Sequence, residues 1–85
     1  MTAGMLNSAA LKQELATLDA RRLDLDARLR DAVARQRYAS SEELAERARS
    51  DEAALLAEMD RLMTRIRAVE AKLLLAASGK RPSWA

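Results

Sequence analysis

The stretch RYASSEEL, residues 37–44, decides how this chain folds, because it interrupts a pattern that otherwise favours helix along most of the chain. Ser40 followed three residues later by Glu43 is the capping-box pattern of a helix N-terminus, and Ala39 and Leu44 are spaced for a hydrophobic staple. We therefore predict that one helix ends here and another begins. The predicted elements are a helix over residues 9–38, a turn at 39–40 and a helix over 41–77.

Apolar residues on both sides of this turn recur at alternating intervals of three and four, the heptad spacing of a coiled-coil seam. In the first helix Arg22 fills the one gap in this spacing. Folding the chain back at the turn predicts an all-α, two-helix antiparallel coiled-coil hairpin. The predicted intrachain seam consists of Leu11, Leu15, Leu18, Leu25, Leu29, Leu55, Met59, Leu62, Ile66 and Val69.

A single continuous helix is the competing prediction. Extended through the turn, the first heptad row would place Glu46 and Asp60 at core positions, which they suit poorly. The second row is offset from the first by two residues, whereas the usual coiled-coil discontinuities insert three or four. The heptad frame therefore favours the hairpin, although an eleven-residue repeat leaves the long helix open.

Charged residues beside the seam specify the register of the hairpin. A turn at Ser40 predicts that facing residues have numbers that total about 80, and this opposes acidic to basic side chains. A slip of one heptad would instead oppose like charges. On the other flank, Lys12 is expected near Glu70. The pairs predicted on the first flank are Glu14 with Arg65, Arg21 with Glu58, and Arg28 with Asp51.

Some apolar residues lie beside the seam, where a two-helix hairpin leaves them in water. We interpret them as a candidate interface, because two hairpins packed into a four-helix bundle would cover them. Scattered surface leucines are common, which is the alternative interpretation. The expected partner is a second copy, giving a homodimer, or another helical protein. The candidate interface residues are Leu23, Leu56, Met63 and Leu74.

Arginines and one tyrosine gather near the turn and support an alternative function, that of a small nucleic-acid-binding regulator. Acidic residues occupy the same region, however. Along the whole chain fifteen basic residues are interleaved with thirteen acidic ones, so the net charge is only +2. The candidate nucleic-acid contacts are Arg28, Arg30, Arg35, Arg37, Tyr38, Arg47 and Arg49.

The composition argues against catalysis and metal binding. The 85 residues suffice for one small domain and include no cysteine and no histidine, so the commonest general base and metal ligand are missing. Phosphate-binding loops and nucleophile elbows are absent as well, and we expect no cofactor and no small-molecule substrate. The expected function is that of a non-catalytic protein-interaction module: an adaptor, a small chaperone or an assembly factor. A piece of a larger coiled-coil assembly is a third possibility.

The two ends carry no periodic pattern. We expect residues 1–8 to be a flexible N-terminus and residues 78–85 a flexible basic tail. Lys80, Arg81 and Trp84 in this tail could dock on a partner or a membrane surface, which the sequence leaves open. No apolar run is long enough to span a bilayer and no signal peptide is visible, so we expect a cytoplasmic location. The excess of arginine over lysine hints at a GC-rich bacterial genome.

Overall fold

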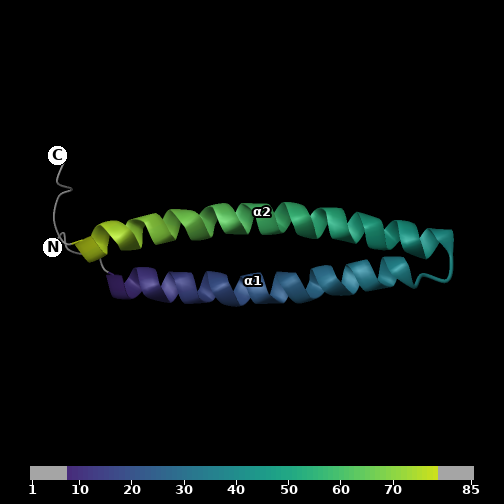
Figure 1. Cartoon of the computed structure of the whole chain (residues 1–85), viewed down its shortest axis with the longest axis horizontal. Coiled ribbons are helices and arrows are strands. Elements are labelled where there is room, and N and C mark those ends of the chain that lie inside the picture. Colours follow the sequence, from purple (N-terminus) through teal and green to yellow (C-terminus); the bar gives the residue numbers. More distant parts are fainter. Residues whose placement is uncertain (1–7, 79–85) are drawn as a thin grey trace.

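Two long helices make up the described part of the chain. The computed structural model describes residues 8–78, with α1 at Ser8–Arg37 and α2 at Glu42–Ser78. The helices lie side by side and run in opposite directions, so α1 begins and α2 ends at the same end of the molecule (Figure 1). The predicted two-helix hairpin is confirmed, and the alternative of one continuous helix is wrong.

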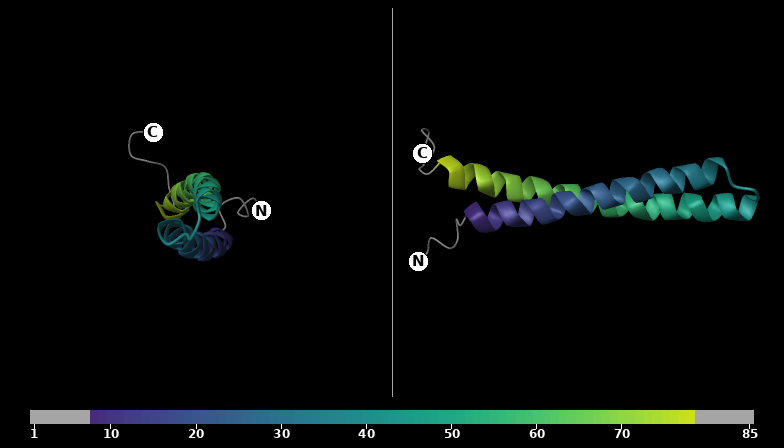
Figure 2. Two further views of the ribbon diagram at one scale, coloured as in Figure 1. Left: turned by 90° about the vertical axis from the view of Figure 1, so that its right-hand side faces the viewer. Right: turned by 90° about the horizontal axis from the view of Figure 1, so that it is seen from below.

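The hairpin is a rod. Its extents are 59 × 25 × 15 Å and its radius of gyration is 18.8 Å, whereas a compact domain of this length has a radius of about 12 Å. Seen from below, α1 and α2 cross, which shows that they are inclined to each other as in a coiled coil (Figure 2). A rod of two helices has a single line of internal contact, so any binding function has to be sought along its surface.

The turn occupies four residues, and its last residue caps α2. The Leu44 N–H donates to Ser41 Oγ at 3.1 Å, which makes Ser41 the N-cap. The predicted capping box of Ser40 and Glu43 is therefore wrong by one residue, because the chain uses residues 38–41, and not two residues, to reverse direction. Glu43 still lies in the first turn of α2, where its negative carboxylate interacts favourably with the positive end of the helix dipole. Each predicted helix end lies within one residue of the observed one.

Replacing the cap tests this assignment. Ser41→Ala is expected to lower the free energy of unfolding by about 1 kcal/mol, since it leaves a backbone donor at the start of α2 without its acceptor. Ser40→Ala is the matched control and is expected to change little, because the Leu44 N–H bonds to Ser41. Urea denaturation of both variants measures the difference. An equal loss in the two variants would contradict the placement of the cap.

The predicted flexible ends fall mostly outside the described residues. Ser8 and Ser78, assigned to those ends by the sequence, belong to the helices. Residues 1–7 and 79–85, including the predicted basic tail with Lys80, Arg81 and Trp84, lie outside the part of the chain that the structure describes.

The seam between the helices forms a narrow core. The buried residues are Leu25, Ala32, Ala48, Ile66 and Val69, and each of the ten predicted seam residues is either buried or partly buried. No polar side chain in residues 8–77 is buried. Charged residues cover the outer surfaces of both helices, and neither described helix has an apolar stretch long enough to cross a bilayer.

Candidate functional site

One side of the hairpin is closed by ion pairs between the helices. Arg65 Nε–H donates to Glu14 Oε2 at 3.1 Å, and Arg21 donates to Glu58. Both pairs were predicted, and they confirm a register in which the numbers of facing residues total about 80. Each exposed pair contributes only ~0–1 kcal/mol, so their main value lies in fixing the alignment of α1 against α2.

The third cross-helix pair on this side differs from the prediction. Asp51 accepts a hydrogen bond from Arg35 at 3.1 Å, while Arg28 pairs at 3.0 Å with Asp24, one turn earlier in α1. The predicted pair of Arg28 with Asp51 is therefore wrong, because a nearer carboxylate on the same helix holds Arg28. We call the side bridged by Glu14–Arg65, Arg21–Glu58 and Arg35–Asp51 the ion-pair flank.

The other side of the seam carries apolar side chains in place of cross-helix ion pairs. Leu23, Asp26 and Met63 help to line one shallow depression, and Asp26, Val33 and Leu56 help to line another, so Asp26 borders both. We call these five residues the Met63 face. Leu23 is 65% exposed and Leu56 is 52% exposed, whereas Met63 is partly buried.

Ion pairs on the side of the Met63 face stay within a single helix. Arg22 Nη2 lies 3.6 Å from Asp19 Oδ1, and Arg30 Nη1 lies 3.4 Å from Asp26 Oδ2. Within residues 8–78, every ion pair that bridges α1 and α2 belongs to the ion-pair flank. Arg22, which sits at a seam position in the sequence, therefore sends its charged head outward to Asp19 instead of into the core.

Two polar details on this side depart from the sequence analysis. Lys12 and Glu70, expected to face each other, form no ion pair within the described residues. Near the turn, Gln36 Nε2–H donates to Glu52 Oε1 at 2.8 Å and so bridges the two helices. Glu52, which is partly buried, therefore has a polar partner on the facing helix. Its partner was missed because Gln36 lies beyond the last predicted seam residue of the first helix.

The predicted interface residues lie on one side of the rod. Leu74 is 73% exposed and follows Met63 by eleven residues, which is three helical turns, so the two share a side of α2. The structure adds Asp26 and Val33, which were not among the predicted interface residues. Both directly follow a seam position in the heptad, and that spacing is the signal that would have found them.

The tip arginines proposed for nucleic-acid binding are mostly engaged within the chain. Arg37 forms no ion pair within residues 8–78, and Tyr38 is 77% exposed. The others pair as follows: Arg28 with Asp24, Arg30 with Asp26, Arg35 with Asp31 and Asp51, Arg47 with Glu43, and Arg49 with Glu42 and Glu46.

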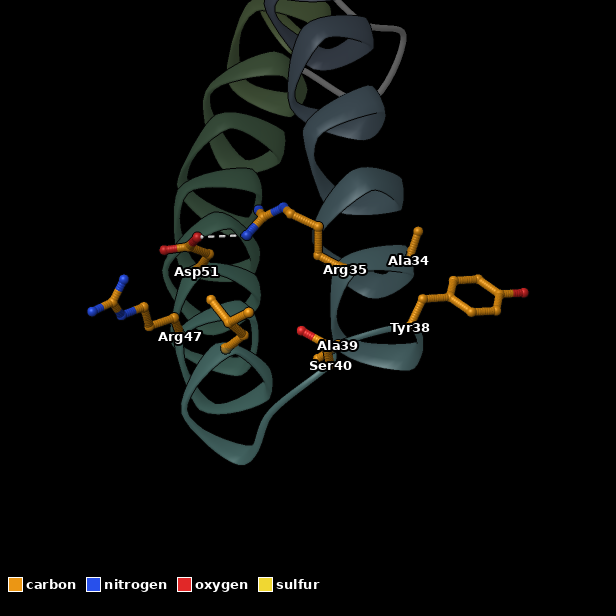
Figure 3. A pocket seen from close by; sticks show the side chains of 8 residues that line it. Ala34, Arg35, Tyr38, Ala39, Ser40, Arg47 and Asp51 are labelled. Carbon is orange, nitrogen blue, oxygen red and sulfur yellow. Dashed lines mark hydrogen bonds and ion pairs between the residues drawn. The ribbon is translucent and has the colours of Figure 1, made fainter.

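A depression of about 540 Å³ lies at the tip, and its lining includes three of the candidate nucleic-acid contacts, Arg35, Tyr38 and Arg47. Arg35 reaches across it to Asp51, the Tyr38 ring points away from α2, and Arg47 points away from α1 (Figure 3). A hydrogen bond to Asp31, which has the largest effect, and one to Asp51 raise the pKa of Arg35 above its ordinary value. Arg35 and Arg47 are therefore directed away from the Tyr38 ring, whereas Tyr38 lines the depression beside Leu56 together with Arg30 and Arg37.

Neither metal chemistry nor known relatives define the site further. The described residues contain no group of three or more side chains placed to hold a metal ion. No protein-family model, no curated protein and no solved structure matches this chain. The Met63 face, defined by its geometry alone, is the candidate functional site.

Proposed function

We propose that this chain is a non-catalytic helical protein-interaction module that acts through the Met63 face, and that two copies pack by this face into a four-helix bundle. The supporting observation is the difference between the two sides of the seam. Three ion pairs bridge the ion-pair flank, whereas the Met63 face leaves Leu23 and Leu56 more than half exposed. A row of exposed apolar side chains on a small protein is typical of an interaction site.

The small core of the hairpin gives a physical reason for association. Burial of apolar surface contributes about 25 cal/mol per Å², and a chain of this length buries too little of it to be more than marginally stable alone. A second hairpin laid on the Met63 face would cover Leu23, Leu56 and the exposed part of Met63. Four helices would then share one core, in which these residues take interior positions.

An adaptor, a small chaperone or an assembly factor would use the same construction. The inner faces would hold two copies together, and the outer faces of a rod 59 Å long would remain for a helical partner. The cytoplasmic location expected from the sequence stays a prediction.

Nucleic-acid binding is the weaker proposal, and titration separates the two. We expect no binding of RNA or duplex DNA at about 0.15 M salt, because five of the six tip arginines already pair with carboxylates of the chain. Fluorescence anisotropy with labelled oligonucleotides at several salt concentrations measures this. Binding that weakens steeply as salt rises would support the nucleic-acid function instead.

Met63→Glu tests the association directly. The new carboxylate would lie where the second copy packs, and burying an unpaired charge is unfavourable, so we expect dimerisation to weaken at least about tenfold. The side chain is only partly buried within one hairpin, so helicity measured by circular dichroism should be retained. Light scattering over a range of concentrations measures the dimer.

Leu75→Glu is the matched control, since Leu75 is 61% exposed on the same helix and lies about 120° around it from Met63. We expect this variant to dimerise like the parent chain. If the parent chain is a monomer at high micromolar concentration, the four-helix bundle is wrong.

A further inference from the structure

Residues on the side of the Met63 face form layers across the two helices. The pairs Glu14–Arg65 and Arg21–Glu58 establish which residues of α1 and α2 lie level with each other along the rod. The same register produces an acidic layer, a leucine layer and a basic layer. These layers consist of Asp19 with Asp60, Leu23 with Leu56, and Arg30 with Arg49, respectively.

The layers follow one another along the rod in a fixed order. The acidic layer lies four residues, about one turn, from the leucine layer, on the side of the open end. The basic layer lies seven residues, about two turns, from the leucine layer, on the side of the turn. The acidic and basic layers therefore flank the leucines on opposite sides, and Asp26, which pairs with Arg30, lies between the leucine layer and the basic layer.

The charged side chains of the acidic and basic layers can form further ion pairs. Asp60 forms no ion pair within residues 8–78, and the ion pair of Asp19 with Arg22 is long, at 3.6 Å. Arg30 and Arg49 pair with carboxylates of their own helices but remain exposed. Arg35 shows that one guanidinium on this hairpin can bind two carboxylates, since it bonds to both Asp31 and Asp51.

Two-fold symmetry allows two ways to stack a second hairpin on this face. With the rods parallel, α1 of one copy lies on α2 of the other and each layer meets itself. Asp19 would then oppose Asp60, and Arg30 would oppose Arg49, so that like charges face each other in both layers. With the rods antiparallel, α1 lies on α1 and α2 on α2. An axis midway between the acidic and basic layers brings each acidic layer onto a basic one.

We propose, building on the homodimer proposed above, that two copies pack antiparallel through the Met63 face. Asp19 of each copy faces Arg30 of the other, and Asp60 faces Arg49. The two-fold axis then passes just beside the leucine layer, so that the leucines of the two copies are offset by about three residues, or ~4.5 Å along the rod. The leucines supply the apolar contact, and the charges select the orientation.

The size of this interface is adequate for a stable dimer. With the axis in this position the rods overlap over about 27 residues, or ~40 Å, and two helices side by side are ~20 Å wide. The contact is then about 800 Å² on each copy, which is the standard size for specific protein interfaces. Leu74 lies outside the overlap, towards the open end.

Disulfide trapping between two single-cysteine chains tests the orientation, since the chain has no cysteine of its own. An Asp60→Cys chain is mixed with an Arg49→Cys chain that carries a size tag, and the mixture is oxidised. The matched mixture combines Asp60→Cys with Asp19→Cys, which are opposed only in the parallel dimer. We expect at least fivefold more mixed disulfide from the first mixture than from the second.

The outcomes separate the orientation from the proposed function. More disulfide from Asp60→Cys with Asp19→Cys overturns the antiparallel arrangement. A dimer in light scattering with no disulfide from Asp60→Cys with Arg49→Cys also overturns it, and leaves the homodimer standing. A monomer in light scattering overturns both proposals.

Charge reversal gives a second and independent test of the orientation of the two hairpins. Asp19→Arg with Asp60→Arg in one chain places positive charge in both layers, so this chain should dimerise at least tenfold more weakly than the parent. Arg30→Asp with Arg49→Asp should weaken dimerisation similarly. A mixture of the two chains should recover the parent affinity. Unweakened dimerisation of either chain alone would contradict the antiparallel proposal, because the parallel dimer keeps like charges opposed in every case.

Discussion

Leu25→Ala is expected to lower the free energy of unfolding by about 2–5 kcal/mol, a large part of the stability that a domain of this size can have. Leu25 is fully buried and is one of the two largest fully buried side chains in the described part of the chain. Its removal therefore costs both the lost burial of apolar surface and the cavity that remains between the helices. Urea denaturation at one fixed protein concentration measures the loss, because stability coupled to dimerisation depends on concentration.

Leu74→Ala is the control for Leu25→Ala. The same chemical change at a side chain that is 73% exposed, outside the proposed overlap, should alter stability by no more than about 0.5 kcal/mol. If the two variants lose equal stability, the seam does not hold the hairpin together.

Ala48→Asp is expected to destabilise the hairpin by about 3 kcal/mol or more, because it places a charge at a fully buried position. The short side chain cannot reach water as an arginine can, and the facing residue in the register, Ala32, is also fully buried and offers no partner. Thermal denaturation followed by circular dichroism at pH 7 measures the effect.

The control for Ala48→Asp is Ala57→Asp, an exposed position in α2 where the substitution costs only the ~0.7 kcal/mol difference in helix propensity. A carboxyl group in an apolar seam prefers its neutral form. The gap between the two variants should therefore narrow on going from pH 7 to about pH 4, where an ordinary carboxyl group is half protonated. A gap that is unchanged or wider at pH 4 would contradict a buried charge as the cause.

Heptad spacing and helix-start chemistry were enough to predict the hairpin and its alignment. Both depend on residues whose neighbours are set by helix geometry, such as Leu25 in the seam or Glu14 opposite Arg65. A slip of one heptad would oppose like charges over several turns, so the sequence encodes the register redundantly.

Where a group has several possible partners nearby, the sequence did not predict which one it pairs with. Asp51 pairs with Arg35 and not with Arg28, because arginine is long enough to reach carboxylates in several layers and Asp24 is nearer to Arg28. The cap falls on Ser41 and not on Ser40, because the number of residues that the chain needs to reverse direction depends on the separation of the packed helices. The sequence offers two adequate candidates in each case.

The candidate face was predicted in outline. Leu23, Leu56 and Leu74 are exposed as the sequence predicted, whereas Met63 is partly buried. The contrast with the ion-pair flank became visible only once each ion pair could be assigned to one side of the hairpin.

The cross-helix contacts enclose lengths of chain that differ greatly. The hydrogen bond of Gln36 with Glu52 joins residues 16 apart, and that of Arg65 with Glu14 joins residues 51 apart. Because the entropy of loop closure grows with the logarithm of loop length, the outer contact costs about 1 kcal/mol more than the inner one if each forms alone. Once the inner contact exists, each outward layer needs to order only one more turn of each helix. The topology thus sets the order of folding events. Pairing of the helices starts beside the bend and advances toward the open end, and loss of structure proceeds in the opposite direction.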